Sequence, residues 1–361
     1  MIQNKKLRLI ACALVVLAAW NFESLLCMWQ NPSDQGKVEA AEEDSATQPL
    51  DEEDLAPIPI VLSPHGHRHA THTHIGGRSN MEDCYTNLPA TGFYGVYDGH
   101  GEQKRYRCET VYSGHLPAQD AKTHLHTYIT EQSADGICKG FLEFNERHTD
   151  HKARGTTATV ITFAPDGTSF FVANVGDSHA VCCIDGKAVR LTQNHHPSEP
   201  FEQERIHKCQ DGIEAIYDTQ CNSKLPMIIE WTAQGPTIST HYLEKVTRVG
   251  RYGSAGLTVS RALGDLESAP FVTAEPFVQE IVCDTSQHFI ILATDGLWDA
   301  ITEQAAVDFV QVKMAALDVN HLTISAEQAT HIAQDLVTTA MGCFQSDNVT
   351  ATIIFLNHPP H

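Results

Sequence analysis

The stretch that most constrains the fold is Phe93–Gly101, an apolar run that ends abruptly in the turn sequence Asp98-Gly99-His100-Gly101. Alternating aromatic and β-branched residues favour a strand. The two glycines favour a turn, because they tolerate backbone angles that other residues resist. A carboxylate at the end of a strand is held rigidly. An Asp-Gly pair after a strand is more often only a turn, so its meaning depends on the rest of the chain.

Further strands and helices follow along the chain. Runs of apolar and β-branched residues, separated by Asp-Gly and Gly-Asp turns, predict strands. These strands are predicted over residues 155–163, 168–175, 180–184, 187–191, 289–294 and 349–356. The first four form a predicted meander. Amphipathic patterns predict two or more helices within 102–148, and Ser or Thr caps predict helices over 302–317 and 325–341.

Four acidic residues stand where predicted strands begin or end: Asp98, Asp177, Asp295 and Asp347. Oxygen ligands without thiolates or paired histidines suit Mg²⁺ or Mn²⁺, which keep several waters and leave room for a phosphate. Two such ions roughly 3.5 to 4 Å apart lower the pKa of a bridging water and clamp an in-line phosphoryl displacement. The strand ends therefore predict a two-metal centre.

Two further side chains suit phosphate chemistry. Arg78 follows a glycine pair and precedes the acidic pair Glu82-Asp83. An arginine grips a phosphate through a planar fork of donors. His100, two residues after Asp98, is placed to protonate a departing seryl or threonyl oxygen.

Together these segments resemble a known family. The motifs are RSNMED (78–83), VYDGHG (96–101), GTTA (155–158), GDS (176–178), SRALGD (260–265), DGLWD (295–299) and DN (347–348). They resemble, in the same order, the motifs of the metal-dependent serine/threonine protein phosphatases, the PPM or type 2C family. The resemblance covers residues 75 to 357. It implies an α+β fold, a four-layer α-β-β-α sandwich with two central antiparallel sheets flanked by helix pairs, and a metal centre at one edge.

The resemblance also implies a set of metal ligands. Asp98 would bridge two Mg²⁺ or Mn²⁺ ions, and Gly99 would contribute its backbone carbonyl. Glu82, Asp295 and Asp347 would complete the two shells, directly or through water.

Five other positions take roles from the same resemblance. Asp177 and Asp299 would join Asp295 in a weaker third metal site, as in some members, and Asp83 would support the centre. Arg78 would bind the phosphate and His100 would act as general acid.

The leading prediction is an enzyme that hydrolyses phosphoserine and phosphothreonine on proteins by attack of a metal-bridging water or hydroxide. Two alternatives remain open: an inactive relative that serves as a scaffold, and a phosphatase of a small phosphorylated molecule. The expected partners are phosphorylated proteins, and the chain is expected to be a monomer. A formal net charge of -21 argues against nucleic acid.

The N-terminus differs from the rest of the chain. Lys5, Lys6 and Arg8 precede an apolar run, so residues 1–30 are predicted to be a signal peptide or a signal anchor. Residues 31–64 carry nine acidic residues against one lysine and are predicted to be a disordered linker. Residues 65–361 form the predicted catalytic domain. The secretory pathway, with a secreted or membrane-anchored product, is the expected location; a cytoplasmic or nuclear one is the alternative.

Three further features carry weaker signals. Residues 209–256 read as an irregular insertion, and we expect this flap to shape substrate choice. The eleven cysteines show no CxxC pair or zinc spacing. Five histidines within 65–74 are of the kind that is usually solvated, so they are excluded from the site.

Overall fold

The computed structural model describes residues 66–101, 104–106, 109–111, 114–148, 151, 153–209, 216–232, 235–250, 256–343 and 347–357. The predicted signal segment and acidic linker lie outside these residues, so both stay predictions. Among the described helices, none has the length and apolar character needed to cross a bilayer.

The first antiparallel sheet has five strands in the order β1-β16-β15-β9-β10. Their bounds are β1 (Arg68–His74), β9 (His179–Ile184), β10 (Lys187–Arg190), β15 (Gln287–Ala293) and β16 (Val349–Phe355). The central strand β15 is apolar along most of its length because it is buried on both faces.

The second antiparallel sheet has seven strands in the order β13-β6-β3-β7-β8-β14, with β2 paired to β3. Their bounds are β2 (Asp83–Leu88), β3 (Phe93–Gly101), β6 (Arg154–Thr156), β7 (Ala158–Phe163), β8 (Ser169–Val175), β13 (Leu263–Gly264) and β14 (Phe277–Val282). The opening stretch of the sequence analysis is therefore an inner strand, β3, bonded to β2, β6 and β7.

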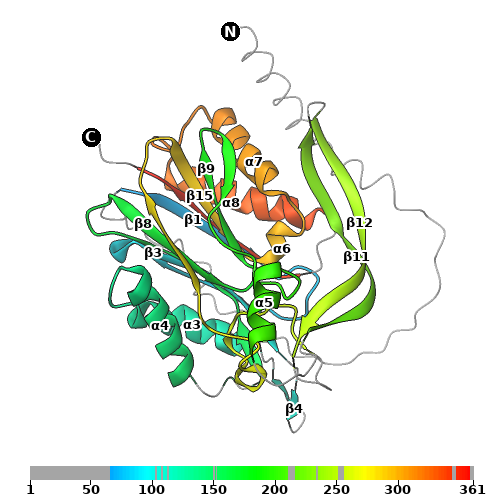
Figure 1. The fold of residues 1–361 in the computed structure, drawn as a ribbon. Coiled ribbons are helices and arrows are strands. Elements are labelled where there is room, and N and C mark those ends of the chain that lie inside the picture. Colours follow the sequence, from blue (N-terminus) through cyan, green and yellow to red (C-terminus); the bar gives the residue numbers. More distant parts are fainter. Residues whose placement is uncertain are drawn as a thin grey trace, which may run out of the picture. The chain divides into compact units, whose positions relative to one another are not determined.

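Helices cover the outer faces of both sheets (Figure 1). Helices α3 (His115–Tyr128) and α4 (Ala134–Arg147) pack on the seven-stranded sheet, and α7 (Glu303–Ala316) and α8 (Ala326–Met341) pack on the five-stranded sheet. This arrangement confirms the predicted α+β class with its four-layer α-β-β-α sandwich. The remaining described elements are η2 (Pro89–Thr91), β4 (Lys104–Tyr106), β5 (Glu109–Val111), α5 (Pro200–Lys208), η3 (Leu266–Ser268) and α6 (Asp295–Trp298).

Alternation along β3 explains the layering. Phe93 and Tyr97 point to the helix side and join the core under α3 and α4, whereas Tyr94 and Val96 point into the core between the sheets. Successive side chains of a strand face opposite ways, so one strand serves two cores. Adjacent cysteines behave likewise: Cys182 packs between the sheets and Cys183 against the α7 and α8 side.

The predicted meander is wrong in one respect. The strands form where expected, but β8 belongs to the seven-stranded sheet and β9 to the five-stranded sheet. The chain crosses between the sheets at Gly176-Asp177-Ser178. Gly176 has φ of 97°, a left-handed conformation that glycine adopts most readily. Turn residues in the sequence mark where the chain reverses, but not which sheet receives the next strand.

The insertion is also more regular than predicted. Within residues 209–256, β11 (Ile216–Thr232) and β12 (Gly235–Val249) form a long antiparallel hairpin. Its register shifts twice, and Pro226 falls within the second shift, where the ladder is interrupted. Proline and glycine therefore mark irregularities in this hairpin and not the absence of strands. The role of this segment in substrate choice stays a prediction.

Candidate metal centre

The site begins at the end of β3, where Asp98 is half-buried. The backbone N–H of Asp98 donates to the Thr157 hydroxyl at 3.1 Å, and Gly99 N–H donates to the Glu82 carbonyl at 3.2 Å. A Cβ on Gly99 would stand 2.0 Å from the Gly114 carbonyl oxygen. Only glycine therefore fits at this position. The predicted turn at 98–101 is wrong, because β3 continues to Gly101 and its last three residues pair with β6, so close packing explains the glycine after Asp98.

The segment from Ile75 to Glu82 is fixed to the start of β16 by Asn348. The side-chain N–H groups of Asn348 donate to the carbonyls of Ile75 and Asn80 at 2.7 and 2.9 Å, and its side-chain oxygen accepts from Glu82 N–H at 2.8 Å. Glu82 in turn accepts from Gly114 N–H, at the start of α3, at 3.0 Å. Asn348 thus brings Glu82 and Asp347 to the same edge although 265 residues separate them in sequence.

Arg78 reaches the cluster from an exposed position. Its guanidinium donates to Asp347 at 2.5 Å, and about half of its side chain is accessible to solvent. Because Arg78 is exposed, its guanidinium can leave Asp347 for another anion without loss of core packing.

Asp83 and Asp295 lie deeper and are incompletely bonded. Asp83 accepts a hydrogen bond from the Thr294 hydroxyl at 2.9 Å through one oxygen, and its other oxygen has no hydrogen-bond partner. Asp295 also has a buried oxygen without a partner. Buried polar atoms without partners are uncommon in folded proteins. Two such carboxylate oxygens at one sheet edge therefore point to a missing ligand.

The acidic side chains of this edge lie close enough together to raise one another's pKa. Burial raises the pKa of Asp98 well above its ordinary value, and the carboxylates of Asp295, Asp83 and Asp347 raise it further. Burial likewise raises the pKa of Asp295, with contributions from Asp177 and Asp299. Burial raises the pKa of Asp83 to about 7. Like charges that lie close together in a partly dry site disfavour ionisation.

Asp177 and Asp299 interact with the same cluster. Asp177 is half-buried in the crossover between β8 and β9, and Asp299 is exposed at the C-terminal end of α6. Both raise the pKa of Asp295, so the structure places them at the same edge as the other predicted acids.

His100 has a partner that the sequence analysis did not assign. Its Nε2 lies 2.5 Å from an oxygen of Asp265, which is almost fully buried, and about a quarter of the His100 side chain is exposed. Burial alone would lower the pKa of His100, but the Asp265 carboxylate outweighs it and the pKa is raised. A Cβ on Gly155 would stand 2.1 Å from the same Asp265 carboxylate. Glycine at 155 thus leaves room for this contact.

The turn that carries Asp265 is anchored by a buried charge cluster. Glu202 on α5 is inaccessible to solvent, and Arg205 and Arg261 each bind one of its carboxylate oxygens, at 2.6 to 3.0 Å. Arg205 also donates to the Ser260 carbonyl at 2.9 Å. Asp265 itself has φ of 49°. The motif SRALGD was recognised in the sequence. The contact between His100 and Asp265 could not be predicted, because the two residues are far apart in sequence and no local pattern indicates that they meet.

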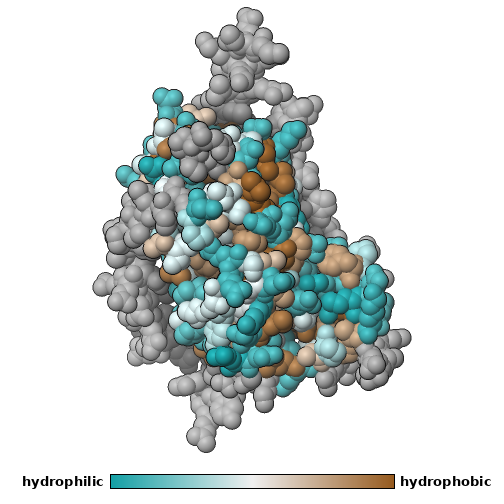
Figure 2. All heavy atoms as spheres, turned by 60° about the vertical axis from the view of Figure 1, so that its left-hand side comes forward, coloured by the Kyte–Doolittle hydropathy of each residue, from teal (hydrophilic) through white to brown (hydrophobic). Residues whose placement is uncertain are grey.

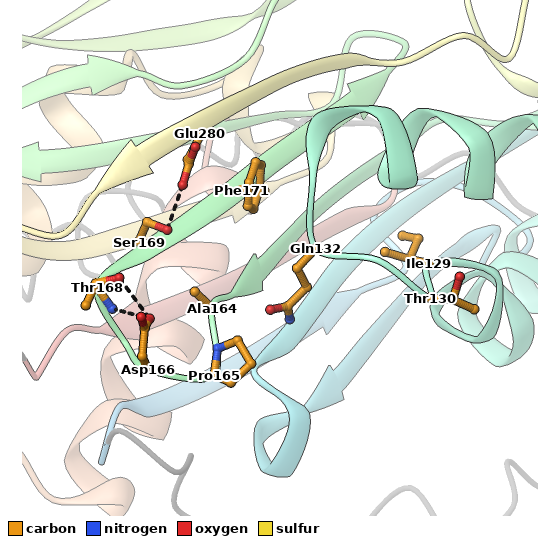
Figure 3. Close-up of a pocket in the computed structure, with 10 residues that line it drawn as sticks. All are labelled: Ile129, Thr130, Gln132, Ala164, Pro165, Asp166, Thr168, Ser169, Phe171 and Glu280. Carbon is orange, nitrogen blue, oxygen red and sulfur yellow. Dashed lines mark hydrogen bonds between the residues drawn. The ribbon is translucent and has the colours of Figure 1, made fainter.

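A pocket of about 820 Å³ lies away from this centre, between the α3–α4 connection and the turn joining β7 to β8 (Figure 3). Thr168 donates to Asp166 within the turn, and Ser169 donates to Glu280 on β14 (Figure 3). Asp177 follows the other end of β8, so this pocket is not part of the acidic site. The surface on this side of the molecule is largely hydrophilic with small apolar groups (Figure 2).

Comparisons with known proteins identify the family. A family model described as Protein phosphatase 2C matches residues 64–349. The chain is 30% identical over 293 residues to "Probable protein phosphatase 2C 45" of Oryza sativa subsp. japonica, covering 78% of this chain and 85% of that protein. It is 27% identical over 321 residues to "Protein phosphatase 1A" of Homo sapiens, covering 82% and 72%.

Solved structures show the same fold. A serine-threonine phosphatase 2C from Toxoplasma gondii aligns with a TM-score of 0.57 at 19% identity, over 83% of this chain and 98% of that one. A sex determining protein of C. elegans aligns with a TM-score of 0.58 at 22% identity, over 81% and 65%. With the family model covering most of its length, the chain belongs to the protein phosphatase 2C family of protein serine/threonine phosphatases, which are hydrolases.

Proposed function

We propose that this chain removes phosphate from phosphoserine and phosphothreonine in proteins, using two Mg²⁺ or Mn²⁺ ions at the edge formed by β3, α6 and the start of β16. The observation that carries the proposal is the set of partly or fully buried carboxylates at this edge, which raise one another's pKa and include two buried oxygens without a hydrogen-bond partner. Divalent cations would remove this repulsion.

The donor set fits these ions. Asp98, Glu82, Asp295 and Asp347 offer carboxylate oxygens and Gly99 a backbone carbonyl, which are the hard ligands that Mg²⁺ and Mn²⁺ prefer. When bound, the ions would lower the pKa of a coordinated water and neutralise charge on the transferring phosphoryl group.

The outer acids take secondary roles in this proposal. Asp177 and Asp299, with Asp295, would hold a weaker third ion. Asp83 supports the centre from beneath, because it is buried and bonded to Thr294, directly before Asp295.

Arg78 and His100 act on the phosphorylated side chain. Arg78 would leave Asp347 and bind two phosphate oxygens through its fork of donors, which its exposure permits. His100 would give a proton to the departing seryl or threonyl oxygen. Asp265 holds the imidazole in place at 2.5 Å and favours its protonated form. Asp265 is a positioning residue, because it would act through His100.

The deciding experiment measures phosphate release from phosphoserine and phosphothreonine peptides by the full chain with Mn²⁺, with EDTA, and with Asp295→Asn. We expect Mn²⁺-dependent release that EDTA abolishes and Asp295→Asn reduces by a factor of about 10³, since a metal contributes several kcal/mol to the transition state. Activity that survived EDTA would falsify the two-metal mechanism. Release from small phosphorylated molecules but not from peptides would contradict the proposed substrate class.

A further inference from the structure

A second group of potential metal ligands lies away from the acidic edge, between α3 and the segment that follows α4. Asp120, His148 and His151 offer three ligand atoms that all lie within 4.8 Å of one another, the one such group of three or more His, Cys, Asp or Glu residues among the described parts of the chain. The Asp120 carboxylate is 2.6 Å from His151 Nε2 and 3.6 Å from His148 Nδ1. From this geometry we propose that these residues bind Zn²⁺.

The donor chemistry separates this group from the phosphatase centre. Two imidazoles and one carboxylate form a borderline-soft set that suits Zn²⁺, whereas oxygen-only ligands suit Mg²⁺ and Mn²⁺. Burial is graded: His151 is about 5% exposed at its side chain, His148 20% and Asp120 39%. The site is open on one side, so an ion can enter without unfolding the helices.

A fourth protein ligand is within reach. His124 follows Asp120 by four residues on α3, so it projects from the same face one turn later. Its ring stacks on that of His148 with centroids 5.6 Å apart, and the His148 and His151 rings are nearly parallel. A change of His124 rotamer, or a water, would complete a tetrahedral shell.

The neighbouring contacts say what must change when the ion binds. Arg154 Nε donates to His151 Nδ1 at 3.2 Å, so His151 Nε2 carries the proton that Asp120 accepts. Zn²⁺ needs the lone pair of Nε2. Binding therefore requires the tautomer with the proton on Nδ1, and Arg154 must turn aside because Nδ1 then no longer accepts its hydrogen bond. The hydrogen bond between Asp120 and His151 would be replaced by two stronger bonds, one from each of these side chains to Zn²⁺.

The sequence analysis missed this site because its residues come as two short pairs, Asp-x3-His at 120 and 124 and His-x2-His at 148 and 151, whose spacings differ from the Cys-x2–4-Cys and His-x3–5-His pairs of zinc fingers. Each pair has a spacing that a helical turn could explain. Only the packing of α3 against α4 brings the pairs together (Figure 1).

The site would act as a structural clamp. Gly264, directly before Asp265, is so close to His151 that an added Cβ would stand 3.1 Å from the histidine Cβ. Arg154 accepts from Asp265 N–H at 2.8 Å through its backbone carbonyl. Zn²⁺ would therefore tie α3 to the residues that support the Asp265 turn, and its expected effect is on stability.

The test is a Zn²⁺ titration of the full chain in excess Mg²⁺, which fills oxygen ligands but competes poorly for imidazole. We expect the wild-type melting temperature to rise with Zn²⁺. In His148→Gln and in Asp120→Asn this rise should be lost, and the Zn²⁺ dissociation constant should increase at least about tenfold to a hundredfold. Co²⁺ in place of Zn²⁺ should give the visible absorption of a tetrahedral site.

Two control variants separate this site from other histidines. His207→Gln, an exposed histidine on α5, should bind Zn²⁺ as the wild type does. The double variant His72→Gln/His74→Gln on β1 should also keep the response. Since His148 and Asp120 are partly exposed, their variants can fold even where a His151 variant does not. An absent response in the wild type, a response retained in both site variants, or one lost in the His72/His74 variant would overturn the proposal.

Discussion

Two groups of buried carboxylates in this molecule have opposite surroundings. Glu202 is completely buried, yet two arginines bind its two oxygens, and their hydrogen bonds outweigh burial and lower its pKa to about 2. At the acidic edge, burial raises the pKa of Asp98 and Asp295, and neighbouring carboxylates raise it further. The protein itself neutralises the first group, and it neutralises the second only in part, through Arg78 at Asp347.

The difference separates structural charge from functional charge. A buried ion pair is costly to break, and both oxygens of Glu202 are already bound by arginines, so they are not available to a ligand. Glu202 therefore holds the Ser260–Asp265 turn in place. The acidic edge has Arg78 at its exposed side as a cation bonded to one of its members, Asp347. In the proposed function, a bound metal ion would compensate the remaining negative charge of this edge, and the cost of that charge to folding would be retained for this purpose.

The largest expected effect is at the edge itself. Asp98→Asn should lower kcat/KM on phosphopeptides by a factor of about 10³ or more, because it removes about 4 kcal/mol of metal-dependent stabilisation of the transition state. In metal-free protein the same change should leave the free energy of unfolding equal or higher, since it removes one of several repelling charges. Phosphate release and urea denaturation in EDTA measure the two quantities.

Asp166→Asn, in the surface turn between β7 and β8, is the matched control and should change neither quantity appreciably. The prediction would be contradicted if metal-free Asp98→Asn protein were much less stable than the metal-free wild type. Asp98 would then be a structural residue like Glu202, and the two groups would not differ in this respect.

Glu202→Gln should mainly lower the stability of the protein, whereas Asp98→Asn mainly lowers its activity. It leaves two buried guanidinium groups without a counter-charge, and the free energy of unfolding should fall by about 3 kcal/mol. Urea denaturation at neutral pH measures the loss. Glu204→Gln on the same helix is the control: Glu204 is exposed and pairs with Lys208 at the surface, so this change should leave the free energy of unfolding close to that of the wild type.

The pH dependence of stability sharpens this prediction. The folded-state pKa of Glu202 is about 2 against an ordinary value of 4.5, so the unfolded chain binds the proton more tightly. The stabilisation is present above pH 4.5 and is lost as the pH falls from about 4.5 toward 2. Glu202→Gln should flatten this part of the stability curve. An equal slope in both proteins would show that other groups cause the acid sensitivity.

The two groups also differ in how far the sequence predicts them. Asp98, Asp295 and Asp347 could be placed because each lies at or near the end of a strand with a strong β pattern, and strand ends of a sandwich gather at its edges. The Glu202–Arg261 pair spans 59 residues and joins a helix to an irregular turn, so no periodicity predicts it. The crossover between the sheets at Gly176–Ser178 was missed for the same reason, because the residues of a turn do not indicate which strand the next one pairs with.

The smallest predicted effect concerns Asp265, which links the two groups, since the turn anchored by Glu202 carries the carboxylate that holds His100. Asp265→Asn keeps the side-chain shape and tolerates the left-handed backbone. We expect kcat on phosphoserine peptides to fall about tenfold, the equivalent of about 1.4 kcal/mol, with little change in KM. An aryl phosphate, whose leaving group needs no proton, should lose less.

Asp318→Asn provides the control for this last change, because Asp318 is also left-handed, with φ of 53°, but is exposed beyond α7. It should leave kcat unchanged on both substrates. Equal losses on the peptide and the aryl phosphate in Asp265→Asn would mean that Asp265 supports the fold of the site and does not act through the proton of His100. A selective loss would show that Asp265 acts through the proton of His100, and would thereby connect the turn that the Glu202 cluster anchors to catalysis.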